Sequence, residues 1–142
     1  MSRLALTDAD REARDWFVEA TKAAGCSITI DEMGNIFAIR PGNRDDARPT
    51  CAGSHMDTQP SGGRYDGILG VTAAVEMLKT LNDNWITTEQ PVAVINWTKY
   101  VDLGNASFSM SDTAKQRGRC PLSNVHGILK RMGRSSPHRE GP

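Results

Sequence analysis

The chain has few cysteines, few aromatic residues and no long apolar run. Its 142 residues include three cysteines, Cys26, Cys51 and Cys120, and no Cys-x-x-Cys pair. An odd and widely spaced set argues against a disulfide framework and against a zinc site built from thiolates. No apolar run approaches membrane-spanning length, and the first residues lack the apolar core of a signal peptide. We therefore expect reduced thiols, no membrane partner and a cytoplasmic location.

Several motifs that would define other functions are also missing. No Gly-Lys-Ser/Thr follows the glycines, which excludes a phosphate-binding loop, and no Gly-x-Ser-x-Gly elbow marks a serine hydrolase. Residues 99–142 hold eight basic and three acidic residues, scattered among Ser and Gly without interleaved aromatic residues. We therefore expect no nucleic-acid partner.

The sequence does contain an ordinary globular composition and a clear alternation of helical and extended patterns. It is 38% hydrophobic and 24% charged. Thr7 can cap a helix whose apolar residues recur at helical spacing until Gly25. Helices that alternate with buried strands indicate an α/β fold. The expected elements are a helix over 8–24, a hairpin of strands 27–30 and 35–39, a strand over 50–54, a helix from 66 to about 82, and a strand over 91–97 covered on both faces.

The regular pattern stops after Thr98, which divides the chain into two parts. Residues 1–98 carry the α/β pattern and an excess of acidic residues, whereas residues 99–142 are basic and interrupted by Gly, Ser, Arg and Pro. Only Val125 to Met132 can form a brief helix in the second part. We predict one folded domain over 1–98 and an irregular basic tail over 99–142.

One imidazole and two carboxylates lie close together between Gly53 and Gly67. If His55 ligates a metal through one ring nitrogen, Asp57 can accept the proton of the other nitrogen and fix the tautomer. Asp66 can then bridge two ions, because a carboxylate has two oxygens. The competing interpretation is a hydrogen-bonded loop with a Gly-Gly turn, since a short His-x-Asp pattern often arises by chance.

The longer string around these residues resembles the N-carbamoyl-L-amino-acid hydrolase and β-ureidopropionase family, a carbamoylase-type branch of the two-metal aminopeptidase-like superfamily. The resemblance covers about residues 1–98. It is carried by Gly53 to Thr58, Gln59-Pro60, Gly62 to Val71, Ile86 to Glu89 and Val94 to Thr98.

This resemblance implies the amino-terminal part of a three-layer, aminopeptidase-like (phosphorylase/hydrolase-like) catalytic domain, so residues 1–98 would be a partial metallo-amidohydrolase domain. Two divalent ions, zinc or manganese, are implied, with His55 and Asp66 as metal ligands and Asp57 as the residue that orients His55. The implied substrate is a small molecule, an N-carbamoyl amino acid or ureido acid. Intact members of the family dimerise.

The sequence departs from the family pattern at Thr98. Family members continue with Asn-Glu-Glu-Gly, whose first Glu acts as general base and whose second binds metal, whereas this chain continues from Lys99 to Gly104 without either Glu. Asp102 falls past the matching positions and is one methylene shorter. The general base is therefore missing, and the substrate-binding residues are unknown.

We expect from this a metal-dependent hydrolase of non-peptide C–N bonds that is truncated and weakly active or inactive. The alternative is a non-catalytic fragment or gene-model artefact that at most associates with an intact relative.

Overall fold

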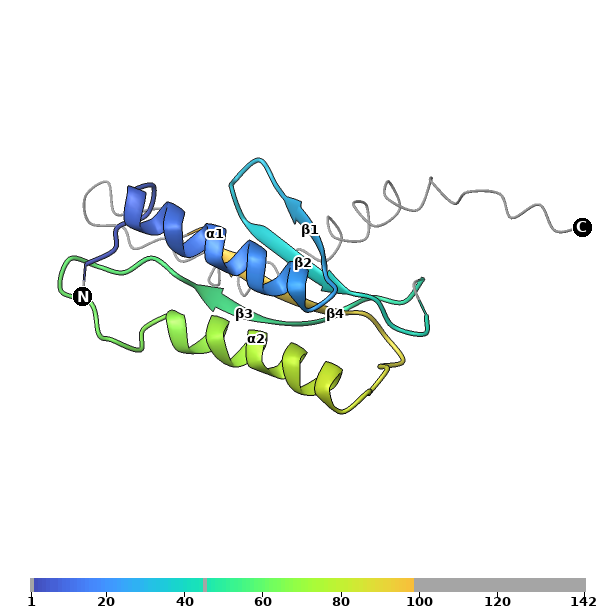
Figure 1. Ribbon diagram of the computed structural model, residues 1–142. Helices are drawn as coiled ribbons and strands as arrows, with labels where there is room; N and C mark the ends of the chain where they lie inside the picture. The colour runs from blue at the N-terminus through green and yellow to red at the C-terminus, as the bar shows by residue number, and fades with distance from the viewer. Residues whose placement is uncertain (1, 45, 99–142) are drawn as a thin grey trace, which may run out of the picture. The chain divides into compact units, whose positions relative to one another are not determined.

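The computed structural model describes residues 2–44 and 46–98, which form a mixed sheet and two helices (Figure 1). The α/β fold expected from the sequence is confirmed. In chain order the elements are α1 (Asp8–Ala23), β1 (Ser27–Ile30), β2 (Ile36–Arg40), β3 (Thr50–His55), α2 (Ile68–Asp83) and β4 (Val92–Trp97). None of the helices in this part of the chain is long and apolar enough to cross a membrane.

The helix α1 begins at the predicted residue and ends at Ala23, one residue before the predicted end. The Thr7 hydroxyl accepts a hydrogen bond from the Asp10 N–H at 3.4 Å, and acidic Asp8 and Asp10 lie in the first turn, where the helix dipole favours negative charge. After Ala24 the chain turns through Gly25 at a φ of 82°, a conformation that favours glycine. Local chemistry therefore sets both ends of this helix.

The strands lie in the order β1-β2-β4-β3. β1 pairs with β2 and β2 with β4 in antiparallel fashion, whereas β3 and β4 are parallel. Parallel neighbours need a crossover connection, which α2 provides. In the register of this pair His55 lies opposite Trp97, so the carboxyl ends of β3 and β4 meet at one edge of the sheet.

Both helices pack on the same face of the sheet. Phe17 of α1 and Leu78 of α2 are fully buried in one apolar cluster with Ile36 of β2 and Val94 of β4. Within the described residues this face carries the helical layer. The three-layer architecture implied by the resemblance stays a prediction.

The second face of the central strands is buried as well. Phe37 and Ile39 of β2 are 4% exposed, and Ala93 and Ile95 of β4 are 0% and 3% exposed. The rings of Phe37 and Trp97 meet edge to face, with centroids 5.9 Å apart. The prediction that β4 is buried on both faces is therefore confirmed.

The element boundaries differ slightly from those expected. β2 is shifted by one residue, β3 includes His55, and α2 begins at Ile68 rather than at Asp66. Gly67 occupies the N-cap position of α2 without a side-chain cap, so Asp66 precedes the helix instead of opening it. The predicted tail over 99–142, with its brief helix, lies outside the described residues.

Candidate metal centre

The candidate site lies at the carboxyl edge of the parallel pair. His55 is the last residue of β3, and the loop that follows it leads to α2. In Figure 1 this green loop runs between the end of β3 and the start of α2. Functional groups of α/β sheets collect at this edge, because the loops that leave the strand ends converge there.

Asp57 holds the imidazole of His55 from one side. The ring nitrogen Nδ1 lies 2.9 Å from the backbone carbonyl oxygen of Asp57 and 3.4 Å from its carboxylate oxygen Oδ1. A carbonyl oxygen only accepts hydrogen bonds, so this contact places the proton of the neutral ring on Nδ1. The sequence predicted the partner, but the backbone of Asp57 is closer to the ring than its carboxylate.

Asp66 lies on the other side of the ring. Its carboxylate oxygen Oδ1 is 3.7 Å from Nε2 of His55. Two ligands of one zinc ion, each about 2.1 Å from the metal, lie roughly 3.4 Å apart at a tetrahedral angle. The His55 side chain is 19% exposed and that of Asp66 is 52% exposed, so the pair is open to solvent. The structure thus brings together the two residues predicted as ligands.

Gly67 packs directly against the His55 ring. Its φ of 74° is in the left-handed region, and a Cβ at this position would clash with the backbone carbonyl oxygen of His55 and lie 2.5 Å from Cε1 and Nδ1 of its ring. Any side chain would therefore displace both the end of β3 and the imidazole. The sequence indicated that the glycines form a hinge, but it did not reveal that Gly67 is a contact surface for His55.

The described residues place two side chains that could hold a metal ion next to each other. Within 2–44 and 46–98 there is no group of three or more His, Cys, Asp or Glu side chains placed to hold one ion. The two candidate ligands are an imidazole nitrogen of His55 and a carboxylate oxygen of Asp66, and both atom types suit zinc and manganese. Asp57 contacts Nδ1, on the opposite side of the His55 ring.

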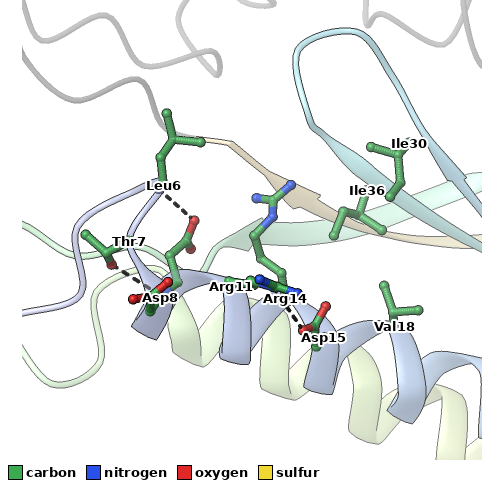
Figure 2. Close-up of a pocket in the computed structure, with 10 residues that line it drawn as sticks. Leu6, Thr7, Asp8, Arg11, Arg14, Asp15, Val18, Ile30 and Ile36 are labelled. Atoms are coloured by element: carbon green, nitrogen blue, oxygen red, sulfur yellow. Dashed lines mark hydrogen bonds and ion pairs between the residues drawn. The ribbon is translucent and has the colours of Figure 1, made fainter.

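A separate groove of about 310 Å³ lies between α1 and the hairpin (Figure 2). Apolar side chains of Leu6, Val18 and Ile30 line it, and Arg14 projects into it. The Arg14 guanidinium donates hydrogen bonds to the Gly34 carbonyl and to the Thr98 hydroxyl. None of the predicted ligands lines this groove, and no sequence motif indicated it.

Taken together, an α/β domain with an imidazole and a carboxylate facing each other at the edge of parallel strands has the arrangement of a candidate hydrolase site. Comparison with known proteins shows which hydrolases the chain resembles. Over 97 residues the chain is 48% identical to an N-carbamoyl-L-amino-acid amidohydrolase of Rhizobium meliloti, covering 68% of this chain and 23% of that protein. Over 98 residues it is 31% identical to a ureidoglycolate hydrolase of Arabidopsis thaliana, covering 69% of this chain and 21% of that protein.

Solved structures give the same result. A hydantoinase/carbamoylase family amidase from Burkholderia ambifaria is 42% identical, with a TM-score of 0.73 over 87% of this chain and 30% of that one. One from Burkholderia multivorans is 39% identical, with a TM-score of 0.73 over 94% and 35%. No protein-family model matches the chain.

The resemblance to carbamoylase-type amidases is therefore confirmed: this chain is similar to a part of these enzymes in both sequence and fold. The chain spans 23% and 24% of the length of two curated relatives named as N-carbamoyl-L-amino-acid amidohydrolases. The named relatives act on C–N bonds other than peptide bonds.

Proposed function

We propose that this chain is part of a metal-dependent amidohydrolase that acts on carbamoyl or ureido C–N bonds. The observation that carries the proposal is the position of Asp66 3.7 Å from Nε2 of His55, while Asp57 holds Nδ1 of the same ring. The names of the relatives support the type of bond.

Each of the three residues has a distinct role in this proposal. His55 would donate its Nε2 lone pair to one ion, and Asp66 would contact that ion and a second one through its two oxygens. Asp57 would fix the tautomer and direction of the His55 ring. Bound ions of this kind supply Lewis-acid polarisation of the scissile carbonyl and an activated water.

The substrate class follows from the relatives and not from a pocket. We infer an N-carbamoyl amino acid or ureido acid, whose hydrolysis with one water releases carbon dioxide, ammonia and the free amine. The groove beside α1 is remote in sequence from the loop that carries Asp57 and Asp66, and we assign no substrate to it.

The proposal extends to the level of activity. Two catalytic ions use about six protein ligands, and the described residues provide His55 and Asp66. The general base expected from the family pattern is absent after Thr98. We therefore propose weak metal affinity and little turnover for the 142-residue chain.

Ammonia release from N-carbamoyl-L-amino acids tests this proposal, with the purified chain assayed in zinc or manganese and again after chelation. We expect turnover near background, and any residual activity should require the metal and disappear in Asp66→Asn. Activity that survives chelation and Asp66→Asn would contradict the assignment. If neither turnover nor metal binding is detected, the non-catalytic alternative is favoured.

A further inference from the structure

The start of the chain is hydrogen-bonded to the loop that carries Asp57, more than fifty residues away. The Arg3 N–H donates to the Thr58 hydroxyl at 2.7 Å, and the Thr58 N–H donates to the Arg3 carbonyl at 2.6 Å. The Arg3 side chain donates from Nε to the Met56 carbonyl at 2.9 Å. Arg3 therefore makes three hydrogen bonds to residues 56–58.

These three bonds flank Asp57 on both sides. Met56 and Thr58 are 2% exposed and Asp57 is 3% exposed, so the loop segment is buried around the residue that contacts His55. The Asp57 carbonyl that accepts the Nδ1 hydrogen bond belongs to the peptide that joins Asp57 to Thr58. A bond to the N–H of that same peptide fixes the direction in which the carbonyl points, because the peptide group is planar.

We propose that Arg3 is a positioning residue that acts through residues 56–58 on the tautomer and direction of the His55 ring. With the carbonyl of Asp57 held in place, the ring carries its proton on Nδ1 and keeps the Nε2 lone pair toward Asp66. If the carbonyl rotates away, the Nε2–H tautomer competes, and a protonated Nε2 cannot ligate an ion.

The consequence for metal binding rests on the proposed function, but the effect on the tautomer does not. It follows only from the hydrogen bonds between Arg3, residues 56–58 and His55. One experiment can therefore show an effect of Arg3 on the His55 tautomer without metal binding, or metal binding without that effect.

The variants separate the side chain from the backbone. Arg3→Ala removes the bond to the Met56 carbonyl, which belongs to the peptide on the other side of Asp57, and so frees one of the two peptide planes that hold Asp57 in place; the backbone bonds to Thr58 stay possible. Arg3→Lys keeps a cationic donor that can reach a nearby carbonyl. Arg11→Ala is the matched control, because the Arg11 side chain is 81% exposed and pairs with Asp15 on the surface of α1.

The measurement is a long-range ¹H–¹⁵N correlation spectrum of the imidazoles, recorded about two units above the ordinary histidine pKa of about 6.5. The signals of His55 are assigned by their loss in His55→Gln, and an amide fingerprint shows that each variant is folded. In the parent chain we expect the Nδ1–H tautomer. In Arg3→Ala the ratio of Nδ1–H to Nε2–H should fall roughly five- to tenfold, the scale of one hydrogen bond, with recovery in Arg3→Lys and no change in Arg11→Ala.

An unchanged tautomer ratio in folded Arg3→Ala would overturn the proposal, as would an equal change in Arg11→Ala. Should Arg3→Ala not fold, Arg3→Met takes its place, because it keeps the length of the side chain but has no donor for the Met56 carbonyl; an unchanged ratio in Arg3→Met would then overturn the proposal. Zinc added to the same samples separates the two claims. A ratio that responds to Arg3 in a chain whose His55 ignores zinc supports the positioning role and contradicts the proposed function.

Discussion

At the scale of single residues, the His55 imidazole contacts Asp57, Asp66 and Gly67 within the part of the chain that the structure describes. Asp57 accepts the Nδ1 hydrogen bond, Asp66 faces Nε2, and the backbone of Gly67 lies against the ring. The sequence predicted the two carboxylate residues because imidazole and carboxylate at short spacing suit a metal ion. It could not predict the Gly67 contact, which depends on how the loop folds back over the strand end.

Substitution of Gly67 should be costly for two separable reasons. Gly67→Ala places a Cβ both at a positive φ and against the backbone carbonyl and the ring of His55, so we expect a loss of more than about 2 kcal/mol. Gly25→Ala carries only the positive φ and should cost about 1 kcal/mol. Gly63→Ala has open space and should change stability by less than about 0.5 kcal/mol.

Urea unfolding of the three glycine variants provides the comparison. If Gly67→Ala were no more destabilising than Gly25→Ala, the close contact between Gly67 and His55 would be refuted.

A buried thiol should make the stability of the domain depend on pH in the alkaline range. Burial raises the pKa of Cys26 from its ordinary 9.0 to about 11, and the charge of Arg40 lowers it in part. Between these two values the unfolded chain loses the thiol proton while the folded chain keeps it, so stability falls as pH rises. Below pH 9 this contribution is fully present.

We expect the free energy of unfolding to decline by about 1–2 kcal/mol between pH 9 and 11 because of this thiol. Cys26→Ala should remove that part of the decline, whatever it does to stability at pH 8. Urea titrations at several pH values measure the slope, and an identical slope in parent and variant would exclude the thiol as its source.

At the scale of secondary structure, the sequence predicted the type and order of every described element. The predictions held because the signals are local: Thr7 caps α1, apolar residues repeat at helical spacing in α2, and the β-branched run of β4 is buried on both faces. The boundary near Asp66 was misplaced by two residues, since the positive φ of Gly67 cannot be recognised from composition alone.

The N-cap of α1 offers a test of this local encoding. Thr7 both accepts from the Asp10 N–H and donates to the Leu4 carbonyl at 2.7 Å, so Thr7→Ala should lower the free energy of unfolding by about 0.5–2 kcal/mol. Thr80→Ala is the matched control on α2, where the hydroxyl bonds back to the Glu76 carbonyl. This control should be neutral or slightly stabilising, because alanine has the higher helix propensity.

Chemical denaturation midpoints, with unchanged slopes, distinguish the two threonine variants. A Thr7→Ala variant as stable as Thr80→Ala would mean that the cap contributes nothing to the helix.

At the scale of the whole molecule, long-range contacts are what the sequence did not predict. The strand order β1-β2-β4-β3 and the bonds from Arg3 to residues 56–58 join segments that share no motif. Such contacts arise from the packing of residues far apart in the sequence, so no local sequence pattern predicts them. The described residues contribute one imidazole, that of His55, and one facing carboxylate, that of Asp66. Their roles as metal ligands stay predictions.

A zinc titration of the ¹⁵N-labelled chain, followed through the two ring nitrogens of His55, tests whether His55 and Asp66 bind one ion. We expect Nε2 to shift on zinc binding while Nδ1 keeps its proton, and Asp66→Asn to weaken the response about tenfold or more. A response at Nδ1, no response of His55, or one that is equally strong in Asp66→Asn would contradict it.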